Sequence, residues 1–195
     1  MKEIILASES KRRSQILKGC NIPHIVVPSG AKEIHKDTKR PQALVMLNAK
    51  IKAENVAQRI RRGIIIGADT LVLFKRRLIG KPRNKSAAKK MLKDFSGNRI
   101  TVYSGIYVID LYNAKRSAGF DKTSLFIKEI PTSDIDKYFR LLGPYDRAGG
   151  FSIEGVGSVV FDNIKGSYFN VLGLPMGRLQ ELFQEIGLDL LDFVQ

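Results

Sequence analysis

The sequence predicts an α/β fold with a mixed central sheet, and three observations favour it. Segments with strand-like and helix-like patterns alternate along most of the chain. Residues 100–112 and 123–130 show the apolar and polar alternation of half-buried antiparallel strands, with a turn at 113–114 between them. The chain has 195 residues and 44% hydrophobic content, which is enough for a sizeable core. We therefore expect a single domain over residues 1–195, which could form one body or two closely packed lobes.

The other elements follow from local apolar runs, helix caps and breaks at glycine or proline. Further strands are expected at residues 3–7, 24–27, 64–66, 71–74, 78–79 and 159–164. Helices are expected at residues 11–19, 41–62, 86–95, 132–143 and 176–186. In the helix at 41–62, Leu44, Leu47 and Ile51 mark the expected buried side, with Val56 and Ile60 as possible further members, and Lys52 lies beside it.

The stretch at residues 64–82, IIIGADTLVLFKRRLIGKP, is the first candidate site. Its apolar strand ends at two small residues, and Asp69 follows at the mouth of the strand. The hairpin expected at 71–79 could return Lys81 close to Asp69. One carboxylate and one ammonium in a single cleft would suit phosphate chemistry. The alternative is an Asp that caps a turn and a surface lysine, and this stretch alone favours that alternative.

The turn before the first helix is a candidate anion site. Ser10 is the expected N-cap, and Arg12 and Arg13 stand in the first helical turn. Backbone N–H groups at a helix N-terminus are unpaired, and the helix dipole favours negative charge there. Two arginines oppose that dipole, so a bound anion is a physical reason for their position. The alternative is a pair of arginines that face solvent.

The composition limits the kinds of metal site and disulfide that the chain can form, and it indicates where the protein is located. Cys20 is the only cysteine, which excludes an intrachain disulfide and a cysteine-type zinc site. His24 and His35 are too few for a histidine-rich metal site, so any metal should be a hard ion held by oxygen atoms. The apolar runs are far shorter than a membrane span, and residues 4–7 are too short for a signal peptide. We therefore expect a cytoplasmic protein with no membrane contact.

The net charge of +14 is unevenly distributed. Residues 1–100 carry 24 Lys and Arg against 7 Asp and Glu, whereas residues 101–195 carry 9 against 12. The basic surplus lies wholly in the first half, which indicates a polyanionic partner such as a nucleotide or a nucleic acid. The alternative is a solvated, lysine-rich surface.

Four separated stretches together resemble the Maf family of nucleotide pyrophosphatases. LASESKRRSQIL resembles the family's LASxSPRRxxLL opening, and IIGADTLV with the later GKP resembles its central signature. SGNRITVYSG resembles SGxxHxVxTG, and YDRAGGFSIEG with NVLGLP resembles YDKAGxYxIQG with NVxGLP. The match runs from about residue 4 to residue 179. Four ordered motifs at family spacing are more specific than any one of them.

The resemblance implies an elongated central mixed sheet flanked by helices, with two lobes around a cleft, as in inosine triphosphatase-like enzymes. It implies a homodimer that hydrolyses a nucleoside triphosphate to the monophosphate and pyrophosphate with a divalent cation, magnesium, manganese or cobalt. By position, Asp69 would be the catalytic base and a metal ligand, and Glu33 would assist the metal. Lys81 would stabilise the leaving group. The triphosphate would be lined by Ser8, Arg12, Arg13 and Lys52. Thr70 and Glu154 would help select the base.

The chain departs from the family pattern at several positions, and Glu154 matters most. Members that act on dTTP and UTP usually have glutamine there, whereas the branch that favours 7-methyl-GTP has glutamate. Asp69-Thr70 and NVLGLP instead resemble the pyrimidine branch. An ionised carboxylate accepts hydrogen bonds but cannot donate them, so glutamate would change which edge of the base is read. The sequence leans to dTTP and UTP and leaves 7-methyl-GTP open.

Two hypotheses outside catalysis stay open at this point. The basic first half could bind a nucleic acid, although no aromatic residues are interleaved with its basic clusters to stack on bases. Alternatively, the chain could bind nucleotides without turnover, because Lys11, Lys32, Ile100 and Arg147 also depart from the family pattern.

Overall fold

The computed structural model describes residues 2–35, 38–143, 145, 149–150 and 152–195. The strands are β1 (Ile4–Ala7), β2 (His24–Val26), β3 (Ile64–Phe74), β4 (Arg77–Ile79), β5 (Arg99–Asp110), β6 (Lys115–Ile127) and β7 (Phe161–Lys165). The α-helices are α1 (Lys11–Gly19), α2 (Pro41–Ala57), α3 (Lys85–Phe95), α4 (Ile135–Leu141), α5 (Tyr168–Leu172) and α6 (Met176–Glu185). Short 3-10 helices are η1 (Thr132–Asp134), η2 (Gly155–Val160) and η3 (Leu190–Phe193).

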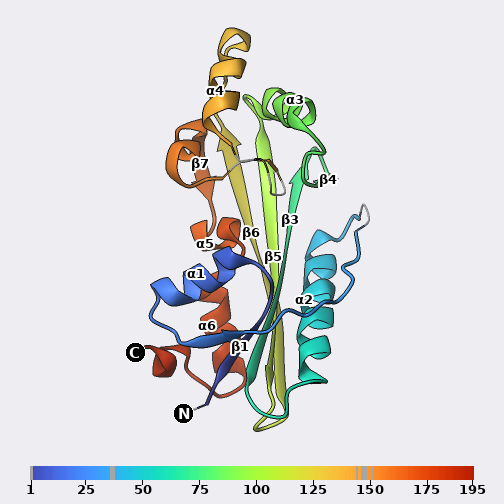
Figure 1. Ribbon diagram of the computed structural model, residues 1–195, viewed down its shortest axis with the longest axis vertical. Coiled ribbons are helices and arrows are strands. Elements are labelled where there is room, and N and C mark those ends of the chain that lie inside the picture. Colours follow the sequence, from blue (N-terminus) through green and yellow to red (C-terminus); the bar gives the residue numbers. More distant parts are fainter. Residues whose placement is uncertain (1, 36–37, 144, 146–148, 151) are drawn as a thin grey trace. The chain divides into compact units, whose positions relative to one another are not determined.

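Within the described residues, the strands form one seven-stranded sheet in the order β2-β1-β3-β5-β6-β7, and β4 pairs with β3 (Figure 1). β1 runs parallel to both β2 and β3, whereas β4 runs antiparallel to β3 and β7 antiparallel to β6. The prediction of an α/β fold with a mixed sheet is therefore confirmed. None of the helices described here is both long and apolar enough to cross a bilayer.

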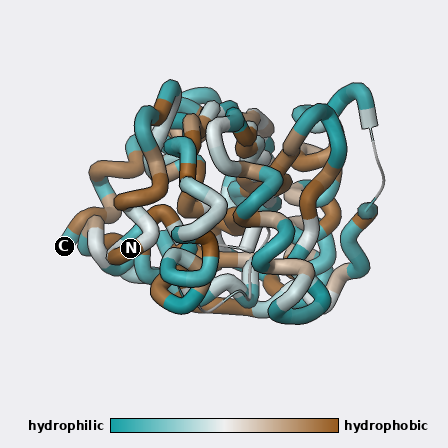
Figure 2. Tube along the Cα trace, turned by 90° about the horizontal axis from the view of Figure 1, so that it is seen from above, coloured by the Kyte–Doolittle hydropathy of each residue, from teal (hydrophilic) through white to brown (hydrophobic). Residues whose placement is uncertain are grey.

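The chain divides into two compact units. The first contains residues 1–70, 103–121 and 168–195, and the second contains residues 71–102 and 122–167. The residues of β3, β5 and β6 are divided between them. Figure 2 shows hydrophobic and hydrophilic residues alternating along the chain trace, as expected where elements bury one side.

The core of the first unit forms between α2 and the parallel strands. Its buried members are Ile5, Ala7, Ala53, Val56, Ile65 and Ile109. In Figure 1, α2 covers one side of β1 and β3, while α1 and α6 lie on the other side. α2 can approach closely because Gly67 and Gly105 have no side chain. A Cβ atom on Gly67 would lie 2.2 Å from the carbonyl oxygen of Ala49 on α2.

Substituting Gly67 is expected to destabilise the first unit. The added methyl group of Gly67→Ala would meet backbone atoms of α2, which cannot rotate away as a flexible side chain could. We expect a loss of about 3 kcal/mol in the free energy of unfolding, measured by urea denaturation. Gly177→Ala on α6 is the matched control, because nothing lies within 4 Å of its added Cβ. That control should gain about 0.5–1 kcal/mol, and equal effects of the two variants would contradict the prediction.

α2 differs from its prediction in its length and in one side chain of its buried side. It ends at Ala57 rather than at residue 62, because the chain must turn to enter β3. The Nε atom of Arg59 also donates to the carbonyl oxygen of Asn55 at 3.4 Å, which occupies one of the last helical carbonyls. Of the side chains expected to be buried, Leu44 and Val56 are, whereas Leu47 is 44% exposed. The buried side is formed by Pro41, Leu44, Val45, Asn48, Ala49, Lys52, Ala53 and Val56.

β6 begins at Lys115 rather than at residue 123. The inward positions of its first part are Ser117 and Gly119, which are small rather than apolar, so the hydrophobic alternation was invisible there. The hydroxyl group of Ser117 donates to the carbonyl oxygen of Leu182 at 2.8 Å, and a Cβ atom on Gly119 would meet the guanidinium group of Arg178. These two small residues allow α6 to pack directly on β6.

Asp110 closes the turn that joins β5 to β6. Its carboxylate accepts hydrogen bonds from the backbone N–H groups of Tyr112 and Asn113 and from the Asn113 side chain, at 2.7–3.3 Å. Burial acts to raise the pKa of Asp110, but these bonds and Lys2 outweigh it and leave the pKa lowered. Because the folded pKa lies below the unfolded value of about 3.9, this stability is present above that value and lost as the pH falls through the folded pKa.

We expect Asp110→Ala to lower the free energy of unfolding by about 1–3 kcal/mol at pH 7, since the turn loses its hydrogen bonds to a charged acceptor. The difference from the unmodified chain should shrink below pH 4. Urea denaturation at pH 7 and at about pH 3 measures both values. A difference that is the same at both values would show that the carboxylate charge is not the cause.

The second unit packs α3 against the end of β3 and against α4. Phe74 and Phe95 meet edge to face with ring centroids 5.0 Å apart. The side chain of Asn84 caps α3 by accepting from the N–H group of Ala87 at 2.8 Å, and Lys89 pairs with Asp136 on α4. The predictions for α3 and for the helix ending near Gly143 are confirmed in position.

Candidate functional site

Asp69 lies within β3, beyond the last residue that pairs with β1, on the face covered by α2. Its side chain is held by two side chains of α2. Nζ of Lys52 lies 2.8 Å from Oδ1, and Nδ2 of Asn48 lies 2.9 Å from Oδ2. Asp69, Lys52 and Asn48 are 3%, 6% and 0% exposed. A buried carboxylate with a donor on each oxygen is fixed in one orientation, as a general base must be.

Lys52 also brings a second carboxylate to this place. Its ammonium group lies 2.6 Å from Oε1 of Glu33 and donates to the carbonyl oxygen of Ala68 at 3.2 Å. Glu33 keeps about a third of its side chain exposed, and its other oxygen lies 3.1 Å from Nε2 of His35. Lys52 therefore bridges two carboxylates, the buried one of Asp69 and the partly exposed one of Glu33. These contacts join three predicted site residues of the first unit: Asp69, Glu33 and Lys52.

A second cluster lies on the opposite face of β3. Because side chains alternate along a strand, Thr70 points away from α2 when Asp69 points toward it. Arg13 from α1 donates through Nη2 to the Thr70 hydroxyl at 3.0 Å and through Nη1 to the Ser8 hydroxyl at 2.9 Å. Its Nε atom donates to the carbonyl oxygen of Gly173 at 2.8 Å. The structure therefore brings Ser8, Arg13 and Thr70 together.

Arg13 is buried, and burial lowers the pKa of its guanidinium group. The negative charges of Asp69 and Glu33 raise that pKa again, and the positive charge of neighbouring Arg12 lowers it. Arginine remains protonated in proteins, so the two clusters are linked by charge across β3. Three of the five N–H groups of Arg13 are committed to protein oxygens, and Arg12, half-buried on α1, supplies a second guanidinium.

The N-terminus of α1 differs in detail from its prediction. Ser10 does occupy the N-cap position, but its side chain makes no capping hydrogen bond. The Ser8 hydroxyl group instead accepts from the N–H group of Ser10 at 3.3 Å, which is a bond within the turn before the helix. The same hydroxyl also accepts from Arg13. Ser8 thereby fixes the turn between β1 and α1 and the position of the arginine.

Both clusters also contain residues that the sequence analysis did not identify, Ser104 in the Arg13 cluster and Asn48 in the Asp69 cluster. Ser104 on β5 shares a hydrogen bond of 2.9 Å with Thr70 and donates to the carbonyl oxygen of Asn170 at 3.0 Å. Nothing in a single sequence indicates these pairs, which join segments 34 and 66 residues apart. Asn48 did carry a signal, because it stands one helical turn before Lys52 and so shares its face.

Two predicted site residues belong to the second unit. Lys81 follows β4, whose pairing with β3 confirms the predicted hairpin, with Val72 opposite Ile79. Glu154 is the N-cap of η2, and its N–H group donates to the Ser152 hydroxyl at 3.1 Å. Their approach to Asp69 stays a prediction. Residues 146–148 and 151 of the YDRAGGFSIEG motif lie outside the described residues.

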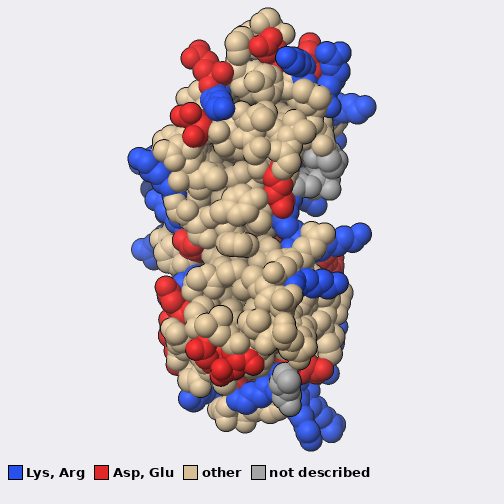
Figure 3. Space-filling view, turned by 90° about the vertical axis from the view of Figure 1, so that its left-hand side faces the viewer, with Lys and Arg blue, Asp and Glu red and all other residues tan. Residues whose placement is uncertain are grey.

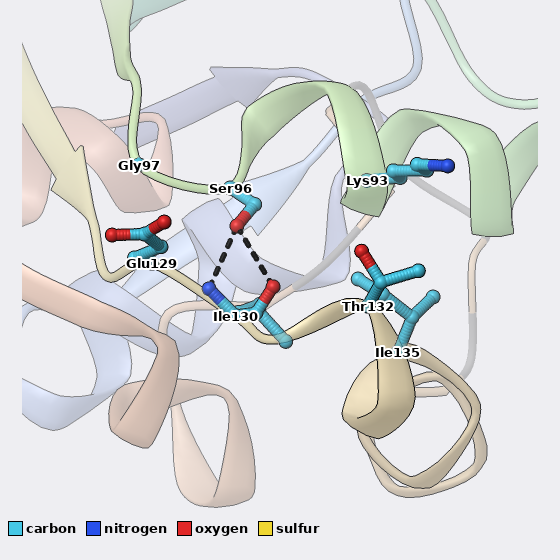
Figure 4. Close-up of a pocket in the computed structure, with 7 residues that line it drawn as sticks. All are labelled: Lys93, Ser96, Gly97, Glu129, Ile130, Thr132 and Ile135. Carbon is cyan, nitrogen blue, oxygen red and sulfur yellow. Dashed lines mark hydrogen bonds between the residues drawn. The ribbon is translucent and has the colours of Figure 1, made fainter.

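The second unit also holds a pocket of about 430 Å³. It is lined by Lys93, Ser96, Gly97, Glu129, Ile130, Thr132 and Ile135 (Figure 4). The Ser96 hydroxyl accepts from the N–H group of Ile130 at 2.7 Å and donates to its carbonyl oxygen at 3.3 Å, so it is engaged in holding the chain. Its described lining includes one cationic side chain, Lys93, and one carboxylate, Glu129, which is a poor match for a triphosphate.

Oxygen atoms in the first cluster fit a hard divalent cation. In the described part of the chain, no group of three or more His, Cys, Asp or Glu side chains is placed to hold a metal ion. Asp69 and Glu33 supply two carboxylates through their shared contact with Lys52. Magnesium is commonly held by one or two carboxylates, with water and substrate phosphates as its other ligands. The donor set therefore suits a cation that arrives with its substrate.

On the face drawn in Figure 3, basic and acidic side chains are both scattered, and most of that face is neither.

The sequence model of the family described as Maf-like protein matches residues 3–186. The dTTP/UTP pyrophosphatases of Caldicellulosiruptor saccharolyticus and Methanosarcina barkeri are each 36% identical over 98% of this chain and 98% of their own. That of Bacillus cereus is 37% identical over 97% of this chain and 98% of its own. Among solved structures, the Staphylococcus aureus Ham1 protein aligns with 66% of this chain and 73% of its own, with 14% identity and a TM-score of 0.43.

Proposed function

This chain belongs to the Maf-like protein family, and we propose that it hydrolyses dTTP or UTP to the nucleoside monophosphate and pyrophosphate. Relatives that carry the name dTTP/UTP pyrophosphatase match almost the whole chain. The observation that carries the proposal is the buried Asp69 carboxylate, with Lys52 and Asn48 each donating to one of its oxygens. This arrangement leaves further lone pairs of an oriented carboxylate available to a water molecule.

In the proposed reaction, Asp69 orients a water molecule and accepts its proton as the water oxygen bonds to the α-phosphorus. The bond from that phosphorus to the bridging oxygen breaks, and the electron pair leaves with pyrophosphate. Arg12 and Lys81 neutralise the triphosphate oxygens, and Arg13 and Ser8 shape the turn that receives them. Lys52 keeps its contacts with Asp69 and Glu33, so its charge offsets that of the two carboxylates.

We propose that Asp69 and Glu33 hold a divalent cation, magnesium, manganese or cobalt, together with the substrate phosphates. Such a cation, when bound, neutralises phosphate charge and makes the α-phosphorus more electrophilic. Lys52 stands between the two carboxylates and would have to share them with the cation.

Base selection is assigned to Thr70 and Glu154. Thr70 is tied to Arg13 and Ser104, so its hydroxyl group has a defined direction. Glu154 is exposed and can accept but not donate hydrogen bonds while ionised. The names of the relatives favour a pyrimidine base, and Glu154 is the reason to keep 7-methyl-GTP as the second candidate.

The test is a panel of canonical and modified nucleoside triphosphates, assayed with magnesium, manganese and cobalt. We expect pyrophosphate and a monophosphate, released fastest from dTTP and UTP. Preference for 7-methyl-GTP would support the second candidate. Release of single phosphate, or no release from any triphosphate, would overturn the proposed reaction. Duplex DNA binding that weakens steeply with salt would then favour the nucleic-acid hypothesis.

We further propose that the chain forms a homodimer, as the family resemblance implies. Sedimentation equilibrium would give about twice the monomer mass of 21.8 kDa. A single species at the monomer mass would overturn this proposal.

A further inference from the structure

Asn48 is a buried polar side chain with every hydrogen-bonding group in use. It lies on α2 and is 0% exposed. Its Oδ1 atom accepts from the N–H group of Ile34 at 2.9 Å, and Nδ2 donates to the carbonyl oxygen of Ile34 at 3.1 Å. The second hydrogen of Nδ2 goes to Oδ2 of Asp69 at 2.9 Å. One amide therefore joins the candidate base to the segment that carries Glu33.

These partners allow only one orientation of the amide. If the amide were flipped, its oxygen would face the Asp69 carboxylate and the Ile34 carbonyl, and its NH₂ group would face the Ile34 N–H. Oxygen would oppose oxygen, and donor would oppose donor. In the observed orientation the amide pairs with both backbone groups of Ile34, as a neighbouring β-strand would. Burial makes this pairing strict, because an unpaired polar group there is costly.

The two donors of Asp69 come from adjacent turns of one helix. Asn48 and Lys52 are four residues apart, so they project from the same face of α2. Lys52 contacts Glu33, and Asn48 contacts the backbone of the next residue, Ile34. Each therefore touches both Asp69 and the 33–34 segment. The separation of the two carboxylates is thus set by a pair of side chains on a rigid element.

We propose that Asn48 is a positioning residue for the reaction, which fixes the place of the Glu33 segment relative to Asp69 and thereby the distance between the two carboxylates. This inference rests on the proposed function in one respect: the two carboxylates are taken to act together on one cation and one water. Asn48 itself would contact neither the cation nor the water molecule. It acts through its hydrogen bonds to Asp69 and Ile34.

Two variants separate the parts of this role. Asn48→Leu removes all three hydrogen bonds but keeps a side chain of similar size. Asn48→Asp keeps an acceptor for the Ile34 N–H, but it loses both donors and places a second negative charge beside Asp69. Asn55→Leu is the matched control, since Asn55 lies on the same helix and its side chain accepts only from exposed Arg59 among the contacts seen for it.

We expect kcat for pyrophosphate release to fall about 10–100-fold in Asn48→Leu and further in Asn48→Asp, with KM changed less than about threefold. Asn55→Leu should keep the parent kcat. Two readouts are independent of turnover. Hydrogen exchange at the Ile34 amide should speed up about tenfold or more in Asn48→Leu and much less in Asn48→Asp. Binding of Mn²⁺ in the presence of the product pyrophosphate, followed by electron paramagnetic resonance, should weaken about 10–100-fold in Asn48→Leu.

The results distinguish this inference from the proposed function. Parent-like kcat in folded Asn48→Leu, or Ile34 exchange unchanged in it, would overturn the positioning role. If the parent chain released no pyrophosphate, the proposed function would fail, and Ile34 exchange with Mn²⁺ binding would still decide whether Asn48 fixes the two carboxylates. If Asn48→Leu did not fold, the Asn48→Asp variant would decide the question. Parent-like kcat in folded Asn48→Asp would overturn the positioning role.

Discussion

Asp69→Asn is expected to lower kcat/KM for pyrophosphate release by about 10³-fold, within the range for removal of a general base. An amide cannot take a proton from water at neutral pH. The substituted side chain also meets two donors, Lys52 and Asn48, with only one oxygen. Its amide oxygen would face Lys52 and its NH₂ group would face the Asn48 amide. We expect the folded state to persist, because Lys52 keeps Glu33 as a partner.

The control for this variant is Asp94→Asn, which removes an exposed carboxylate paired only with Lys90 on α3 among its ion-pair partners seen here. It should leave kcat/KM within about twofold, since exposed ion pairs contribute little. Circular dichroism and thermal unfolding show whether each variant is folded. If folded Asp69→Asn retained more than a tenth of the parent activity, the base would be another group, and the proposed mechanism would be wrong.

Much of the fold was predictable because its strands carry local signals. The buried run at β3 is apolar at each of its first three positions, and small residues follow where α2 approaches. β6 was predicted only in its second half, since Ser117 and Gly119 occupy inward positions and give no apolar signal. Strand patterns report burial of apolar groups and do not register an inward face filled by small residues.

One position on the buried face of α2 was misjudged for a related reason. Helical periodicity places the apolar side chains at the core, which selected Leu47 over Asn48. In the structure Leu47 is 44% exposed and Asn48 is fully buried, because the stripe that faces the sheet contains the two side chains that hold Asp69. A polar pair at a spacing of four residues inside a buried stripe is the pattern of a functional site, and hydrophobicity alone reads it as surface.

The arginine cluster could be identified only in part from the sequence. Ser8, Arg13 and Thr70 were named from motifs, but their mutual hydrogen bonds and the carbonyl oxygen of Gly173 were not foreseeable. Gly173 is 160 residues from Arg13 along the chain. Contacts at that separation depend on how strands pair, which a single sequence does not specify.

Lys52→Met is expected to lower stability by removing a buried charge. Methionine fills a similar volume but leaves the carboxylates of Asp69 and Glu33 near each other without their shared cation. Removing one partner of a buried ion pair typically costs about 3–5 kcal/mol, and the partial exposure of Glu33 places the expected loss near the lower value, about 3 kcal/mol. Urea denaturation measures the free energy of unfolding, and the activity should fall with it.

A double variant tests whether charge is the cause. In Lys52→Met with Asp69→Asn, the buried carboxylate is neutral, so we expect the free energy of unfolding to recover by about 1–2 kcal/mol relative to Lys52→Met alone. Lys50→Met is the matched control on the same helix, because its exposed pair with Glu54 at 3.8 Å should contribute less than about 0.5 kcal/mol. Strictly additive losses in the double variant would mean that Asp69 is not held in place by the charge of Lys52.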